Sequence, residues 1–180
     1  NSSYYTFDSE RYLMTSDIKR VRDISANAPY DQIYILANSE KYGGGAIYNF
    51  YSVTVTKNPS FKEIFLHELG HGIAGLADEY GYDDTYDSFY LKDVEPWERN
   101  ITTLVHFEDK WKHMINEETQ IPTPNNEDSY DKIGVFEGAG YVNKGIYRST
   151  YNSIMRSLKS DGFNLVSQEA LKEVILFYSK

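Results

Sequence analysis

The segment His67-Glu68-Leu69-Gly70-His71 holds the residues whose types and spacing most clearly permit chemistry. On an α-helix, residues four apart lie about 40° apart around the axis and one turn along it, so both imidazoles can face one point. Two histidines in this arrangement are typical zinc ligands, and the glutamate between them is placed to act as a general base on the water that zinc activates. The pattern therefore predicts His67 and His71 as metal ligands and Glu68 as the catalytic base.

A hydrolytic zinc site needs a third protein ligand, and the chain contains no cysteine to provide it. Asp78 and Glu79 follow the expected helix, and the segment 75–77 lets the chain turn back towards the histidines. Asp78 is the favoured ligand on this spacing. The alternative for residues 78–80 is an acidic loop cap, or a calcium-binding loop completed by Asp83, Asp84 and Asp87. We therefore expect one catalytic Zn²⁺, with Ca²⁺ left open as a further ion.

The helix that carries this segment is expected to begin at Ser60, because Ser60-x-x-Glu63 forms a capping box. An i, i+4 stripe should pack against the core, on a face separate from the histidines: Phe61, Phe65, Leu69 and Ile73. Glycine inside a helix costs about 1 kcal/mol relative to alanine. Three of them, Gly70, Gly72 and Gly75, predict tight packing beside the site and a helix end near Gly75.

Two β-rich segments precede this helix. Residues 32–37 (QIYILA) are expected to form a buried strand, and residues 46–56 (AIYNFYSVTVT) a second strand. The glycines at 43–45 have two open interpretations: a flexible lead into the second strand, or close approach of its backbone to an extended ligand. A helix capped by residues 15–17 and ended by Pro29 comes before both strands. Helix followed by strand indicates an α/β layer.

Beyond residue 78 the apolar periodicity that indicates helices and strands is weaker. Residues 78–97 are expected to be a long loop, and residues 134–151 an irregular, glycine-punctuated segment. A helix capped by Thr102 or Thr103 should bury an apolar face and leave a polar face solvated, with His106, Lys110 and His113 on the polar face. A second metal site at those histidines is the weaker alternative. Ser167 should cap a last helix whose core-facing residues are Ala170, Leu171, Val174, Ile175 and Tyr178.

The composition limits the class of protein. A chain of 180 residues with 41% hydrophobic residues can form one domain with a real core. Acidic residues (27) outnumber basic ones (18), and the net charge of −9 disfavours nucleic acid and anionic membranes as partners. No apolar run approaches the roughly 20 residues that a membrane span needs. The first residues lack a signal-peptide pattern, so we expect a trimmed form of a secreted, cell-surface or periplasmic protein, with a cytosolic protein as the alternative.

The segment HELGHGIAGLADEY, residues 67–80, resembles the zinc-binding signature of the bacterial IgA-peptidase family of metallopeptidases, which lies near the metzincins. Further similar segments cover most of the chain: FYSVTVTKNPSFKEIF, DVEPWERNITTL, KIGVFEGAGY and the turn SIMR around Met155. The resemblance implies zinc bound by His67, His71 and Asp78, Glu68 as catalytic base, and Met155 as the methionine of a Met-turn. Gly75 and Asp78 fall one position later than in the general metzincin signature.

The resemblance also implies a fold. We expect one α+β, metzincin-like catalytic domain over residues 1–180, with an upper lobe of about residues 1–75 and a lower lobe of about 76–180. The upper lobe would hold a twisted mixed sheet and the active-site helix. The lower lobe would be irregular, with the Met-turn and the C-terminal helix. In this family an edge strand of the sheet binds the substrate peptide antiparallel to itself, and residues 46–56 are the candidate for that strand.

The leading hypothesis is a zinc-dependent endopeptidase of protein substrates, with immunoglobulin A suggested by the family name. The alternative from another class is a binding or adhesion module on a metallopeptidase fold, with weak or lost catalysis. An intact Glu68 argues against it. A third hypothesis makes the histidine pair part of a purely structural domain. Its imidazoles and carboxylate would then need hydrogen-bond partners in place of a metal. The sequence leaves the oligomeric state open.

Overall fold

The computed structural model describes residues 2–82 and 89–179. The chain divides into two compact units, residues 1–75 with 173–180, and residues 76–172. The described residues form three α-helices and three small sheets, which confirms the expected α+β class. None of the described helices is long and apolar enough to cross a membrane.

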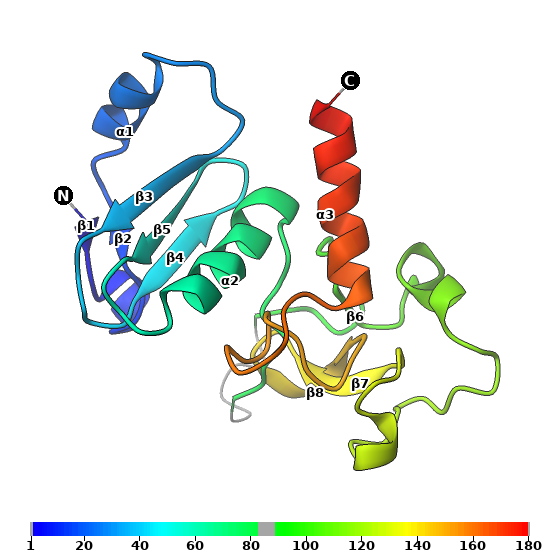
Figure 1. The fold of residues 1–180 in the computed structure, drawn as a ribbon. Coiled ribbons are helices and arrows are strands. Elements are labelled where there is room, and N and C mark those ends of the chain that lie inside the picture. Colours follow the sequence, from blue (N-terminus) through cyan, green and yellow to red (C-terminus); the bar gives the residue numbers. More distant parts are fainter. Residues whose placement is uncertain (1, 83–88, 180) are drawn as a thin grey trace. The chain divides into compact units, whose positions relative to one another are not determined.

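The first unit is built on a three-stranded sheet of β3 (Ile33–Ala37), β4 (Gly44–Ile47) and β5 (Tyr51–Val55), in the order β3-β5-β4 (Figure 1). The central strand β5 runs parallel to β3 and antiparallel to β4, and all its residues are buried. The predicted single strand over residues 46–56 is therefore wrong. A turn at Asn49, which adopts a left-handed φ of 55°, splits it into two strands, because asparagine tolerates this conformation better than most residues.

Shorter elements complete the N-terminal part of this unit. The strands β1 (Ser2–Ser3) and β2 (Met14–Thr15) pair antiparallel around a 3₁₀ turn, η1 (Thr6–Asp8). Helix α1 (Ile18–Ser25) begins after Asp17, whose carboxylate accepts a hydrogen bond from the Arg20 amide, as the sequence predicted. The strand β3 was expected to be buried, but it lies at one side of the sheet and is partly exposed.

Helix α2 (Phe61–Ala74) packs against β4 and β5 and ends at Gly75, which has the predicted left-handed conformation (φ 58°). The predicted capping box is not formed, since the Ser60 side chain makes no capping hydrogen bond. The fully buried face also differs from the predicted stripe, which is half-buried; the buried residues are Ile64, Glu68, Gly70, Gly72 and Ala74. A Cβ on Gly72 would lie 2.3 Å from the Ser52 hydroxyl of β5, which confirms that this glycine permits tight packing.

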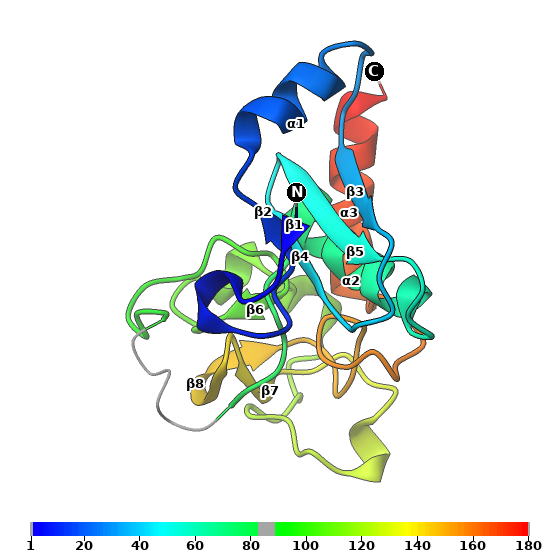
Figure 2. The same ribbon diagram turned by 90° about the vertical axis from the view of Figure 1, so that its left-hand side faces the viewer.

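The second unit contains an antiparallel sheet of β6 (Ile101–Thr102), β7 (Phe136–Ala139) and β8 (Val142–Arg148), in the order β6-β8-β7. Figure 2 shows β7 and β8 side by side. The prediction of an irregular segment over residues 134–151 is wrong, because β7 and β8 form a hairpin there. Glycines in this segment serve the bulge at Gly138 and the turn at Gly140, where φ is 97° and 59°.

The predicted helix after Thr103 is replaced by two short 3₁₀ turns, η3 (Phe107–Asp109) and η4 (Lys112–Met114). Lys110 was expected on a solvated face, but it is buried, and its ammonium donates to the carbonyls of Pro96 and Glu98. The neighbouring Trp111 is also buried and donates from Nε1 to the Gly134 carbonyl, at 2.7 Å. These hydrogen bonds to segments 12 to 23 residues away hold both adjacent side chains in the interior.

The chain ends in a further 3₁₀ turn, η5 (Glu127–Ser129), the β7–β8 hairpin and helix α3 (Leu165–Tyr178). The cap of α3 is Asn164, whose Oδ1 accepts from the Ser167 amide at 2.9 Å, and the expectation of a Ser167 cap is wrong. Val166 and Ala170 are buried. The predicted core stripe does not extend to the end of the helix: Ile175 and Tyr178 are more than half exposed.

Candidate metal centre

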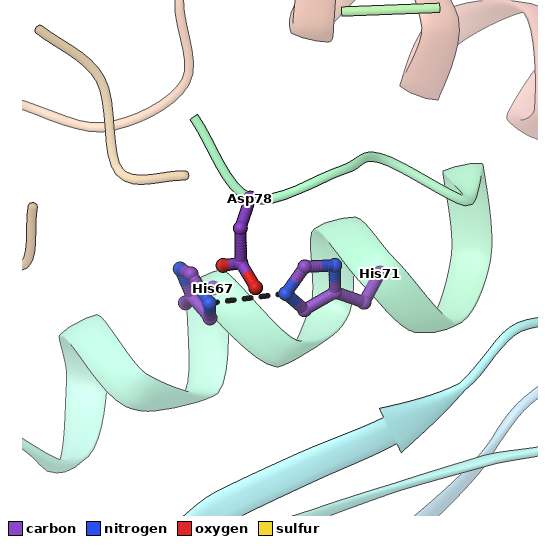
Figure 3. A group of neighbouring side chains, drawn as sticks. All are labelled: His67, His71 and Asp78. Atoms are coloured by element: carbon purple, nitrogen blue, oxygen red, sulfur yellow. Dashed lines mark hydrogen bonds between the residues drawn. The ribbon is translucent and has the colours of Figure 1, made fainter. Parts of the chain in front are cut away.

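His67 and His71 occupy consecutive turns of α2, and both side chains are half-buried. Their Nε2 atoms lie 3.0 Å apart. Asp78 follows the end of the helix and is buried. One ligand atom from each of the three residues lies within 4.8 Å of the other two, and Figure 3 shows the carboxylate of Asp78 beside the imidazoles. Within residues 2–82 and 89–179, these three residues form the group of His, Asp or Glu side chains that can hold a metal ion.

The donor set fits zinc. Two imidazole nitrogens and one carboxylate oxygen make the three-ligand set of a hydrolytic site, which leaves a fourth position for water. Ligands about 2.0–2.2 Å from a tetrahedral ion lie roughly 3.3 Å from each other. The separation of the two Nε2 atoms, 3.0 Å, is close to that value. Little rearrangement of the histidines would therefore be needed to bind the ion.

Glu68, the predicted base, is buried on α2. Its backbone carbonyl accepts a hydrogen bond from the Ser52 hydroxyl of β5 at 3.1 Å, which ties this turn of the helix to the central strand. Its side chain lies against β4, because a Cβ on Gly44 would lie 2.6 Å from Glu68 Oε1. The carboxylate is therefore packed against the backbone of a strand as well as held on the helix.

The packing around the three glycines, Gly43 to Gly45, bears on the first of their two interpretations, the flexible lead. A Cβ at each would meet a different side chain of this protein: the Tyr4 ring at Gly43, Glu68 at Gly44 and the Met14 sulfur at Gly45. Gly44 and Gly45 lie within β4 and all three are buried, so the segment is not a flexible lead into the strand. The glycines permit a close approach of side chains of the chain itself, and approach of an extended ligand to this strand stays a prediction.

Glu79, the other candidate ligand, lies at the centre of a buried hydrogen-bond network. Its carboxylate accepts from Asn100 Nδ2 at 3.0 Å, Asn164 Nδ2 at 3.1 Å and Ser153 Oγ at 2.5 Å. Burial raises the pKa of this carboxyl, while the three hydrogen bonds act in the opposite direction. These donors hold Glu79 as a structural anchor of its segment. Asp83, Asp84 and Asp87, the other members of the possible calcium loop, lie outside the described residues.

Met155 is fully buried, and its carbonyl accepts a hydrogen bond from the Glu79 amide at 2.9 Å. The chain turns around it, since the amides of Arg156 and Ser157 both donate to the Ser153 carbonyl. The turn predicted as the Met-turn is thus fixed directly to the segment that carries Asp78. No local sequence pattern indicates this link, because the two segments are about 75 residues apart.

The remaining histidines, His106 and His113, each have a glutamate as partner. His106 is paired with Glu108 at 3.6 Å and His113 with Glu169 at 3.7 Å, and all four side chains are exposed. They do not belong to the group of metal-ligating side chains found among the described residues. The exposed positions expected for these two histidines are confirmed.

Sequence reasoning missed one residue of the centre. The hydroxyl of Tyr141, in the turn between β7 and β8, donates a hydrogen bond to Asp78 Oδ2. A tyrosine 63 residues from its partner has no local spacing signal. Its position in KIGVFEGAGY, a segment similar to the family, was the available indication.

Replacing Asp78 by alanine is expected to weaken zinc binding at least tenfold, because the ion would lose its oxygen ligand and keep the two histidines. Competition with a chromogenic chelator measures the change. Asp131→Ala, at an exposed position of the same unit, is the matched control and should bind zinc as the wild type does. Equal affinities for the two variants would exclude Asp78 as the third ligand.

Two comparisons with known proteins bear on this chain. The family model described as IgA Peptidase M64 matches residues 1–133 and 125–175, which together include His67, His71, Asp78 and Met155. A search of curated proteins gave no match.

Proposed function

This chain belongs to the IgA peptidase M64 family and is a peptidase, and from that premise we propose that it is a zinc-dependent endopeptidase. The observation that carries the proposal is the convergence of one ligand atom each from His67, His71 and Asp78 within 4.8 Å. We further propose the metzincin-like arrangement for it, with α2 as the active-site helix and residues 153–157 as the Met-turn.

His67, His71 and Asp78 would hold the ion. A zinc ion bound there would supply Lewis acidity and would lower the pKa of a coordinated water to about 7, which makes a nucleophile available at neutral pH. Two neutral imidazoles and one carboxylate leave the site with a net positive charge when it is loaded. That charge would favour the negative oxygen that develops on the substrate carbonyl during attack.

Glu68 would act as the general base and then as the general acid. It directly follows the first ligand, and its burial against Gly44 keeps the carboxylate in one place. In this role it accepts the proton of the attacking water and passes it to the nitrogen of the leaving amine. The carboxylate ends the cycle in its starting state, so no further proton donor is required.

The substrate proposed is an extended segment of a protein, with immunoglobulin A as the first candidate because the family carries its name.

The fold limits which of residues 46–56 can pair with a substrate strand. The central strand β5 is flanked by β3 and β4, so within residues 46–56 only the part that belongs to β4, Ala46 and Ile47, lies at an edge of the sheet. At Gly44 that edge already pairs with residues 11–13, through hydrogen bonds to Arg11 and from Leu13. Pairing of a substrate would therefore be centred on Ala46 and Ile47. With immunoglobulin A as the substrate, we propose that the enzyme acts outside the cytoplasm, as a secreted, cell-surface or periplasmic protein.

The test combines metal analysis with cleavage assays of the wild-type protein. We expect one zinc ion per chain, cleavage of immunoglobulin A or of denatured proteins, loss of cleavage after chelation, and its return when zinc is added back. Stoichiometric zinc with no cleavage of any substrate would favour a binding module on a peptidase fold. A chain that binds no metal would contradict the proposal outright.

A further inference from the structure

We infer that Tyr141 is a positioning residue that orients Asp78 for metal binding. This inference rests on the proposed function, in which Asp78 is a ligand. It assigns a role to a residue outside the His-Glu-His segment and outside the Met-turn. Both residues belong to the second compact unit, so their contact is a feature of that unit alone.

The contact is held from both the side chains and the backbone. The Tyr141 hydroxyl donates to Asp78 Oδ2, and the Gly140 amide donates to the Asp78 carbonyl at 2.9 Å. The pairing continues along the chain: the Tyr141 amide donates to the Tyr80 carbonyl at 2.9 Å, and the Tyr82 amide to the Tyr141 carbonyl at 3.0 Å. Residues 78–82 are therefore hydrogen-bonded to the β7–β8 turn, and the Tyr141 hydroxyl points at the Asp78 carboxylate.

The turn itself does not explain a tyrosine at this position. Ala139 pairs with Val142, so Gly140 and Tyr141 are the two central residues of a hairpin turn, with φ of 59° and 72°. Positive φ at both positions is typical of a type I′ turn, which favours glycine or asparagine at each of them. A left-handed conformation is unfavourable for a residue with a bulky side chain. A strained residue next to a candidate site indicates that its side chain has a function there.

Neighbouring rings fix the direction of the Tyr141 side chain. Its ring meets Phe89 edge-on at 5.1 Å and Tyr80 at 5.5 Å between centroids, and stacks with Tyr82 at 6.2 Å. These contacts restrict the ring before any metal binds. The phenolic hydrogen bond then costs little further side-chain entropy, which is the condition for an effective positioning group.

The chemical consequence concerns the Asp78 carboxylate. A hydrogen bond to Oδ2 fixes the rotation of the carboxylate and favours metal coordination through its other oxygen. Partners of this kind set the orientation of a ligand, and their removal usually lowers metal affinity 10- to 100-fold. Spacing in the sequence does not reveal Tyr141 as this partner, because only the folded chain brings it next to Asp78, 63 residues away.

The experiment measures the zinc dissociation constant of Tyr141→Phe by chelator competition, beside the unfolding temperature of the metal-free protein. The substitution keeps the ring and its packing and removes the hydroxyl alone. We expect zinc affinity to fall about 10- to 100-fold, with the metal-free unfolding temperature nearly unchanged. Tyr147→Phe is the control: this tyrosine lies on β8 and packs against the cluster around Trp111, so zinc affinity should stay at the wild-type value.

A double-mutant cycle with Asp78→Ala separates positioning from a general structural effect. If Tyr141 acts through Asp78, adding Tyr141→Phe to Asp78→Ala should change zinc affinity less than about twofold. Wild-type affinity in Tyr141→Phe would overturn the inference and leave the proposed function standing. If Tyr141→Phe lowers zinc affinity 10- to 100-fold also in the Asp78→Ala protein, the inference is overturned as well. A wild-type protein that binds no zinc would remove the proposed function and this inference together.

Discussion

Glu68→Gln is expected to retain one zinc ion per chain and to lose peptide hydrolysis by about 10²–10⁴-fold, the usual contribution of a general base. Glutamine keeps the volume and the planar end group of the buried side chain, so the packing against Gly44 should persist. It cannot accept a proton from water at neutral pH. The measurements are metal content and the rate of cleavage at saturating substrate, side by side with the wild type.

The control for this variant is Glu63→Gln, in the first turn of the same helix. It removes the same charge from α2 at a position away from the histidine segment, and we expect a rate close to wild type. Cleavage by Glu68→Gln at the wild-type rate would exclude Glu68 as the base. Loss of zinc from this variant would instead assign Glu68 a part in holding the metal.

The second large effect is expected at a residue that carries no functional group. In Gly44→Ala, the new Cβ would lie 2.6 Å from Glu68 Oε1 and 2.9 Å from Ile64 Cγ2. The strand cannot easily move away, because the Gly44 amide and carbonyl are both bonded to the segment 11–13. The Glu68 carboxylate must therefore shift. A displacement of about 1 Å at a catalytic group lowers activity roughly 10²-fold, and we expect that loss with zinc content unchanged.

Gly43→Ala is the matched control, because its Cβ would make an equally short contact, 2.5 Å, with the Tyr4 ring instead of with Glu68. Both variants should lose some stability through overpacking, about 1–3 kcal/mol. The activity per folded, zinc-loaded molecule should fall in Gly44→Ala alone. Equal activities of the two variants would show that the contact with Glu68 has no catalytic consequence.

The sequence by itself determined the local part of this protein. The four-residue spacing of His67 and His71 places both imidazoles on one side of any helix, and Gly75 ends that helix through its left-handed conformation. The position of Asp78 shortly after this end limited the search for a third ligand to a few residues. Each of these conclusions depends on the geometry of one short segment, which the residues of that segment largely control.

Tertiary structure decided which side chains are buried and which distant segments meet. The helix expected after Thr103 is replaced by short turns, and Lys110 and Trp111 are buried there with hydrogen bonds to other segments of the chain. The anchoring of Glu79 by Asn100, Ser153 and Asn164, and the contact of Tyr141 with Asp78, join residues 21 to 85 positions apart. No periodicity in the sequence encodes such pairs, since their energy is gained when the backbone brings the segments together.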